Sequence, residues 1–191
     1  ILFYLPAICT STIVGTVFSK IFETNRGYLN VILRALHLDF LCQQWLATPK
    51  TALACLLFVN IWQWTGYSML MYYTNMLNIP QDLYESATID GAGSFKQFIY
   101  ITFPLLRGTH ITLIILDILG ALKFFDLSYV LTDGGPAHAT ETFSTYIYTK
   151  SFSTFQQGQA STIVVFMFLI AMVLTVIQLK IYYKKDRKEM N

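Results

Sequence analysis

Long apolar runs separated by polar segments dominate the pattern along the chain. They lie at about residues 2–22, 52–76, 104–125 and 160–182. A helix needs about 20 apolar residues to cross the hydrocarbon core of a membrane, and a lipid-facing strand would leave its backbone polar groups unpaired. The pattern therefore predicts an all-α fold, a polytopic transmembrane helix bundle with four spans. The third run is the least apolar, because it contains Asp117 and Lys123.

Composition agrees with this prediction and excludes several soluble classes. Hydrophobic residues make up 54% of the 191 residues and charged residues 13%, against about 25% charged residues in an average soluble domain. A disordered chain, a nucleic-acid-binding tail and an ordinary soluble enzyme are therefore excluded. We expect membrane lipid, and no nucleic acid, to surround the chain.

Basic residues are concentrated at the end of the chain, where the last 12 residues carry a net charge of +3. Cytoplasmic segments next to spans are enriched in Lys and Arg. We therefore place residues 184–191 in the cytoplasm, as a basic tail after a transmembrane domain of residues 1–183. With four spans, residues 77–103 form a cytoplasmic loop, whereas 20–50 and 126–159 lie outside.

The chain begins at Ile1, without a basic segment before its first apolar run. We therefore expect a fragment whose N-terminal part is missing. The cysteines lack the spacing of a metal or disulfide framework, which favours packing roles for Cys9, Cys42 and Cys55. The histidines also lack ligand spacing, so we expect no metal site at His37, His110 or His138.

The cytoplasmic loop is predicted to contain two short helices. Pro80 suits the first helical position, and the acidic residues after it suit a helix N-terminus. The segment 91–93 (Gly-Ala-Gly) ends that helix, and Ser94 with Gln97 resembles a capping box that starts the next one. Such a hairpin is either a contact for a partner protein or an ordinary surface feature.

The loop resembles the EAA loop of ABC importer permeases, whose pattern is Glu-Ala-Ala, three residues, Gly, nine residues, Ile, one residue, Leu-Pro. The matching stretches are Glu85-Ser86-Ala87-Thr88-Ile89-Asp90-Gly91 and Ile101-Thr102-Phe103-Pro104. Ser86 replaces the first Ala and Phe103 the Leu. The segment 131–142, which includes Thr-Asp-Gly-Gly-Pro, and the segment 60–67 are similar to the carbohydrate-uptake, maltose-type class.

The resemblance, which covers about residues 3–183, implies the last four helices of a type I importer permease that has six or more. It implies a multi-pass protein of a bacterial or archaeal cell membrane, with a second permease subunit beside it. It also implies an extracytoplasmic binding protein that delivers a sugar. A cytoplasmic ATPase dimer would bind ATP and Mg, so this chain would hold no cofactor and would not be an enzyme.

The same resemblance implies an ATPase-coupling role for Glu85, Ala87, Asp90, Gly91, Ile101 and Pro104. Glu85 can meet basic or backbone donor groups of the partner, Ala87 allows close approach, and Gly91 gives the turn its backbone freedom. For Asp90 the alternative is a carboxylate that only completes the turn.

Polar residues inside spans tend to face a cavity. Asp117, Ala121 and Phe124 recur at i, i+4 and i+7, so on a continuous helix they share one face and are candidates for the sugar path. Ser11, Gly66 and Tyr67 are further candidates. The alternatives are a bond of Ser11 to its own helix and a place for Tyr67 in an interfacial aromatic belt.

A second function is compatible with part of the sequence. An ATP-independent secondary transporter or channel would explain Asp117 and Lys123 as an ion relay, but it leaves the EAA spacing unexplained. The sequence offers no nucleophile–base pair and no carboxylate pair for an intramembrane enzyme.

Overall fold

The computed structural model describes residues 2–189, and side chains are placed up to residue 180. Every regular element in this part of the chain is helical, which confirms the all-α prediction. Three long helices form the body, α4 (Pro49–Met76), α8 (Arg107–Leu122) and α11 (Gln157–Glu189). The shorter elements are the 3-10 turn Leu2–Tyr4, α1 (Leu5–Ile8), α2 (Ser11–Ile21), α3 (Tyr28–Ala35), the 3-10 turn Asp39–Leu41, α5 (Gln81–Ile89), α6 (Ser94–Gln97), the π turn Phe98–Thr102, α7 (Phe103–Leu105), α9 (Asp126–Thr132), α10 (Phe143–Tyr148) and the π turn Thr149–Ser153.

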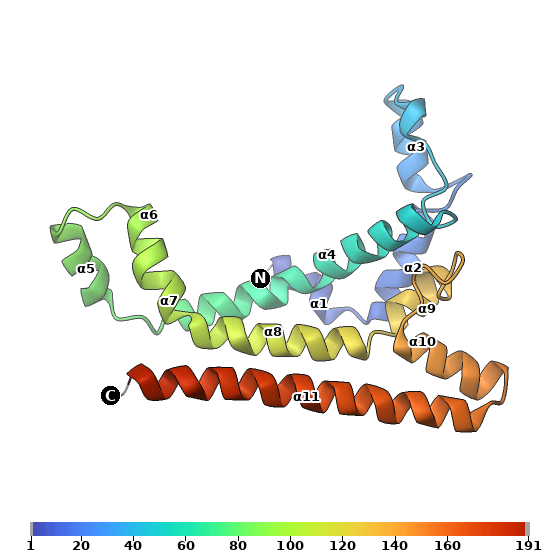
Figure 1. The fold of residues 1–191 in the computed structure, drawn as a ribbon. Coiled ribbons are helices and arrows are strands. Elements are labelled where there is room, and N and C mark those ends of the chain that lie inside the picture. Colours follow the sequence, from blue (N-terminus) through green and yellow to red (C-terminus); the bar gives the residue numbers. More distant parts are fainter. Residues whose placement is uncertain (1, 190–191) are drawn as a thin grey trace.

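The bundle is elongated, with different short elements at its two ends (Figure 1). The hairpin made by α5, α6 and α7 lies at one end, beside the C-terminal end of α11. Helices α2, α3, α9 and α10 lie at the other end. Helix α8 runs from the hairpin end of the bundle towards the other end. It contacts both α4 and α11 on its way.

The first predicted span is broken. A continuous helix over residues 2–22 was expected, but α1 and α2 meet at an angle of 104°. Cys9 and Thr10, which separate the two helices, have extended backbone. Thr10 is the N-cap of α2, and its hydroxyl accepts a hydrogen bond from the Ile13 amide. The Nε2 of Gln63 on α4 donates a hydrogen bond to the Cys9 carbonyl at 3.1 Å. This bond replaces the backbone bond that the Cys9 carbonyl would accept in a continuous helix.

The other spans agree with the prediction to different degrees. Within residues 2–189, α11 from Gln157 to Lys180 is the one helix that is both long and apolar enough to cross a membrane by itself. Up to three spans result if two bent pairs each count as one, α1 with α2, and Ser94–Leu105 with α8 at 62°. Helix α4 has 28 residues and is about 42 Å long, but polar residues such as Asn60 and Gln63 lower its mean hydropathy.

The fourth helix is longer than predicted. It begins at Gln157 instead of residue 160 and continues to Glu189, through most of the predicted basic tail. Residues 190 and 191 lie outside the described part of the chain. Little of α11 is buried, because α8 and α10 cover only part of its surface. Its remaining apolar surface suits lipid or another membrane subunit.

The apolar core joins α2, α4 and α9. Its buried members are Val14, Phe22, Cys55, Val59, Leu127 and Leu131. Asn30 holds the segment between α2 and α4 together. Its side chain donates to the carbonyls of Thr24 and Gln43 and accepts a hydrogen bond from the indole of Trp45 at 2.8 Å. This core sits at the end of the bundle opposite the hairpin, where it packs α2 against α4 and α9.

Gly66 gives a test of the contact between α4 and the start of the chain. A Cβ at Gly66 would lie 1.7 Å from the Phe3 carbonyl oxygen, whereas a Cβ at Gly120 on α8 would meet nothing within 4 Å. We predict that Gly66→Ala destabilises the protein by about 1–3 kcal/mol, as overpacked sites do. Thermal unfolding of the detergent-purified protein measures this effect. Gly120→Ala is the control and should be neutral or slightly stabilising; equal stability of both variants would contradict the close contact.

Candidate functional site

The hairpin at residues 81–105 is the first part of the candidate site, and it coincides with the predicted cytoplasmic loop. Its first arm is α5, and its second arm runs without interruption through α6, the π turn and α7. The hydroxyls of Tyr84 and Thr102 lie 2.9 Å apart and join the two arms near their base. Thr102 is buried, so this bond lies in the interior of the hairpin.

Gly91 forms the turn between the arms through its backbone conformation. Its φ is +76°, and its amide donates to the Thr88 carbonyl, while the Ala92 amide donates to the Ala87 carbonyl at 2.9 Å. These two bonds make a Schellman motif, which satisfies the last carbonyls of α5. A Cβ at Gly91 would meet nothing within 4 Å, so glycine is favoured here by the left-handed φ and not by crowding.

The predicted capping box at Ser94 and Gln97 is wrong. Gly93 is the N-cap of α6, and no side chain caps that helix. Gln97 instead reaches across the turn, where its Nε2 donates to the Thr88 hydroxyl at 2.9 Å and to the Ala92 carbonyl at 3.1 Å. A side chain that crosses the hairpin fixes the angle between its arms more directly than a local cap would.

Most of the residues that the EAA resemblance selects lie on the accessible surface of this hairpin. Glu85, Asp90, Gly91 and Pro104 are exposed, and Ala87 and Ile101 are half-buried. Asp90 is the C-cap of α5, which fits the turn alternative for this residue. The motif did not include two large apolar residues that flank the turn, Ile89 (87% exposed) and Phe95 (77% exposed). Their position on either side of a glycine turn is the feature of the sequence that could have predicted their exposure.

His110 secures the point where the hairpin joins α8. Its Nδ1 lies 2.8 Å from the Tyr72 hydroxyl on α4, and its Nε2 lies 3.2 Å from the Phe103 carbonyl. Because a carbonyl only accepts, Nε2 carries the proton and Tyr72 donates to Nδ1. The imidazole therefore joins α4, α7 and α8 at the bend, a role that the sequence did not indicate.

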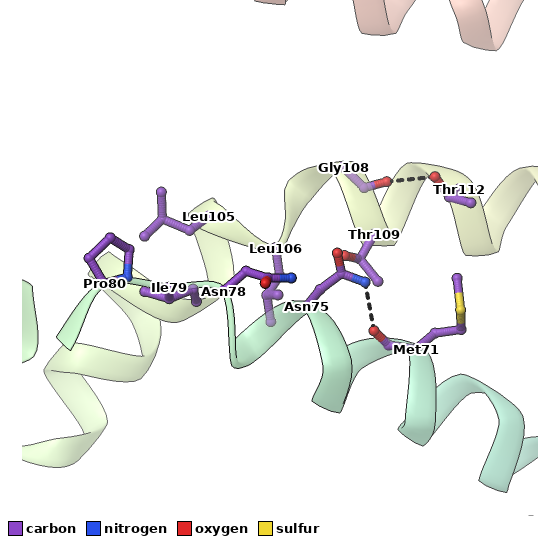
Figure 2. Close-up of a pocket in the computed structure, with 10 residues that line it drawn as sticks. All are labelled: Met71, Asn75, Asn78, Ile79, Pro80, Leu105, Leu106, Gly108, Thr109 and Thr112. Carbon is purple, nitrogen blue, oxygen red and sulfur yellow. Dashed lines mark hydrogen bonds between the residues drawn. The ribbon is translucent and has the colours of Figure 1, made fainter.

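A cavity of about 500 Å³ opens beside this joint, between the end of α4 and the start of α8 (Figure 2). Its polar lining comes from Asn75 and Asn78 on one side and from Thr109 and Thr112 on the other. Leu105 and Leu106 cover part of its wall. Thr109 and Thr112 have the i, i+3 spacing that places two side chains on one face of α8, whereas Asn78 lies in the turn that follows the end of α4 at Met76, so the sequence did not predict this cavity.

The structure separates the three predicted path residues of the third span. Asp117 and Ala121 are exposed on α8 and one turn apart. Phe124 lies beyond the end of α8 at Leu122, and its half-buried ring packs on the core cluster. The prediction that all three share one helix face is therefore wrong for Phe124. The Asp117 carboxylate makes no hydrogen bond or ion pair with any residue of the described chain.

The three candidates from the first and second spans lie in different surroundings, and only Ser11 lies at the break between α1 and α2. Ser11 accepts a hydrogen bond from Gln63 Nε2 at 3.3 Å, so its side chain connects α2 to α4. The alternative, a bond of Ser11 to its own helix alone, is therefore wrong. Gly66 is buried against the backbone of Phe3. Tyr67 is half-buried, with its ring 6.2 Å from that of Trp64. Over the residues described, no three His, Cys, Asp or Glu side chains are grouped closely enough to hold a metal ion.

Comparison with known proteins extends over the whole bundle. Residues 1–187 match the family described as binding-protein-dependent transport system inner membrane component. The chain is 35% identical to the probable ABC transporter permease protein YurN of Bacillus subtilis, over 98% of this chain and 64% of that protein. It is 33% identical to the trehalose/maltose transport system permease protein MalF of Thermococcus litoralis, over 93% of this chain and 59% of that protein. The chain thus spans less than two thirds of either relative.

A solved structure shares the fold. It is a bacterial alginate ABC transporter in complex with an alginate pentasaccharide-bound periplasmic protein. One of its chains aligns with a TM-score of 0.83 and 25% identity, over 92% of this chain and 60% of that chain. The overall helical arrangement of this chain therefore occurs in a solved transporter.

Proposed function

The chain belongs to the family of binding-protein-dependent transport inner membrane components, and from this premise we propose that it forms part of the sugar path of an ATP-driven importer. In this proposal it crosses the cell membrane several times beside a second permease subunit. A cytoplasmic ATPase dimer binds ATP and Mg and drives the cycle. An extracytoplasmic binding protein delivers the sugar.

The hairpin at residues 81–105 is the observation that carries the proposal. It combines the EAA spacing with a turn fixed by a Schellman motif and by Gln97. Ile89 and Phe95 expose large apolar side chains beside this turn, and exposed apolar surface on a rigid element is typical of a protein-interaction site. A docked ATPase would cover these two side chains and Glu85.

The hydrogen bonds at the base of the hairpin would transmit a movement of the hairpin to the long helices. Tyr84 with Thr102 ties its two arms together, and His110 ties the second arm to α4 and α8. Displacement of the hairpin by the ATPase would therefore move α4 and α8 with it. A loosely attached loop would absorb the same displacement without passing it to the bundle.

The sugar path is proposed along α4 and α8. Asp117 and Ala121 on α8 are exposed, and an unpaired carboxylate in an apolar span needs water, a partner or substrate hydroxyls. Tyr67 offers an aromatic ring on α4. Gly66 and Phe124 are better explained by packing, and Ser11 by its bond to Gln63. The names of relatives such as MalF support a sugar as the substrate class.

Gly91 provides the test of coupling. We predict that Gly91→Val leaves the complex assembled but lowers ATP-dependent uptake about tenfold, because a β-branched residue in the left-handed region costs roughly 1–2 kcal/mol or more. Gly91→Asn is the matched control, since asparagine tolerates this conformation. Uptake and substrate-stimulated ATP hydrolysis are measured per assembled complex in proteoliposomes. Normal coupling in the valine variant would contradict the proposed role of the turn.

Asp117 provides the test of the path. If its carboxylate accepts substrate hydroxyls, Asp117→Ala should lower the apparent affinity for the sugar roughly ten- to a hundredfold, the effect of losing a charge-assisted bond of about 1.5–3 kcal/mol. Asp39→Ala, which removes an exposed carboxylate outside the bundle, is the control. Unchanged uptake per complex would remove Asp117 from the path. A lower yield of assembled complex would instead assign it to subunit packing.

A further inference from the structure

Four aromatic rings form a continuous cluster at the end of the bundle opposite the hairpin. The rings of Phe125 and Tyr129 are stacked, with centroids 5.1 Å apart and planes at 16°. Tyr148 contacts both rings, at 5.3 and 5.0 Å, and Phe152 contacts Tyr148 at 5.1 Å. Tyr129 and Phe152 are exposed, so the cluster reaches the surface where Figure 1 shows α9 and α10.

A braced loop closes over one side of this cluster. The buried Ser128 hydroxyl donates to the Thr140 carbonyl at 2.6 Å. The Thr140 hydroxyl lies 2.6 Å from that of Thr132 and donates to the Gly135 carbonyl at 2.7 Å. These bonds tie Thr140, near the end of the loop at residues 133–141, both to α9 and to Gly135 near the start of the loop. The loop is therefore held in one shape before any ligand arrives.

The cluster and the loop enclose a cavity of about 340 Å³. Its lining includes Tyr129, Asp133, Glu141, Tyr148, Thr149 and Ser153. A cavity of this size falls within the range of small-molecule sites, which combine aromatic walls with a few polar groups. It is distinct from the proposed path residues on α4 and α8.

The polar groups of the cavity keep hydrogen-bonding capacity for a ligand. The exposed Asp133 carboxylate has no hydrogen-bond or ion-pair partner in the described chain. The Glu141 carboxylate has one contact, to His138 Nδ1 at 3.2 Å. A hydrogen bond with Tyr148, and the negative charge of Asp133, raise the pKa of Tyr129. A phenol with an ordinary pKa of about 10 is already protonated at neutral pH, and the raised pKa keeps Tyr129 in that form.

We propose that this cavity is an outer sugar subsite, which holds one unit of a neutral saccharide before it enters the membrane path. The inference deepens the proposed function and rests on it. Saccharides present C–H faces that pack on aromatic rings and hydroxyls that donate to carboxylates, and the cavity offers both kinds of group. Asp133 and Glu141 accept hydroxyl hydrogen bonds, and Tyr129 and Tyr148 supply the apolar wall.

The negative charge of the cavity determines whether it favours neutral or acidic saccharides. Two carboxylates face the cavity, its lining contains no Lys or Arg, and its one histidine, His138, contacts Glu141. An acidic sugar would place its own carboxylate beside Asp133 and Glu141, where like charges repel. The subsite therefore favours neutral oligosaccharides and disfavours uronic-acid polymers, in contrast with the alginate carried by the structural relative's binding protein.

Saturation-transfer NMR on the detergent-purified importer, with the binding protein omitted, tests this subsite. The probes are maltotriose, arabinotriose and an alginate trisaccharide. We expect at least one neutral probe to receive saturation and the alginate probe to receive none. Asp133→Asn keeps a residue that tolerates the left-handed φ of 50° and should weaken binding about tenfold. Tyr148→Ala should abolish the signal.

Tyr146→Ala is the matched control, because Tyr146 lies on the same helix, pairs with Lys150 and does not line the cavity. It should bind like the wild type. Three outcomes overturn the subsite: binding of alginate in preference to both neutral probes, no binding of either neutral probe by the wild type, or wild-type binding by Asp133→Asn and Tyr148→Ala. A separate pull-down with the binding protein distinguishes the alternative: if both variants keep wild-type NMR binding but lose affinity for that protein, the subsite is overturned and the surface is a protein-docking site.

Uptake separates failure of the subsite from failure of the proposed function. In proteoliposomes with the complete importer, ATP-dependent uptake of a neutral sugar supports the proposed function whatever the NMR result. Wild-type uptake that is unaffected in Tyr148→Ala, together with unaffected NMR binding, overturns the subsite alone. Absence of ATP-dependent uptake with intact NMR binding overturns the proposed function and leaves a sugar site on a different kind of protein.

Discussion

A helix that breaks inside an apolar environment must find new partners for the backbone groups it frees, and the rest of this structure depends on that requirement. At the first break Gln63 donates to the Cys9 carbonyl. At the bend before α8, His110 donates to the Phe103 carbonyl. At the end of α8, the Thr142 hydroxyl donates to the Phe124 carbonyl at 2.6 Å. Each bend is thus fixed by a specific side chain, because unpaired carbonyls are costly in the absence of water.

These bonds give the bundle two working ends joined by long helices. The hairpin connects to α4 and α8 through His110, and the segment that follows the loop at residues 133–141 connects to the end of α8 through Thr142. A displacement at one end therefore has a continuous packed route to the other, through elements with defined bends. This arrangement is what a transporter needs if a cytoplasmic motor is to change the access of a site near the opposite surface.

The sequence was sufficient for the helical class, the four apolar segments and the hairpin, because periodicity, glycine and the EAA spacing are local signals. It was insufficient for the breaks. Nothing in the run at residues 2–22 indicates that Gln63, more than fifty positions away, will satisfy a freed carbonyl. The same reason explains the error at Phe124, where the helix ends one turn early. The cavity beside Asn75 and the aromatic cluster around Tyr148 also depend on contacts between distant segments.

Site-specific cross-linking tests whether the hairpin contacts the ATPase. Ile89→Cys, in a chain whose native cysteines are replaced by serine, would be treated in membranes with a short thiol–amine cross-linker. Phe155→Cys serves as the reference, because Phe155 is exposed and belongs to the segment between α10 and α11, which lies at the end of the bundle opposite the hairpin. We expect position 89 to form an adduct with the ATPase and position 155 to form none. An adduct with an extracytoplasmic protein at position 89, or an ATPase adduct only at position 155, would contradict this expectation.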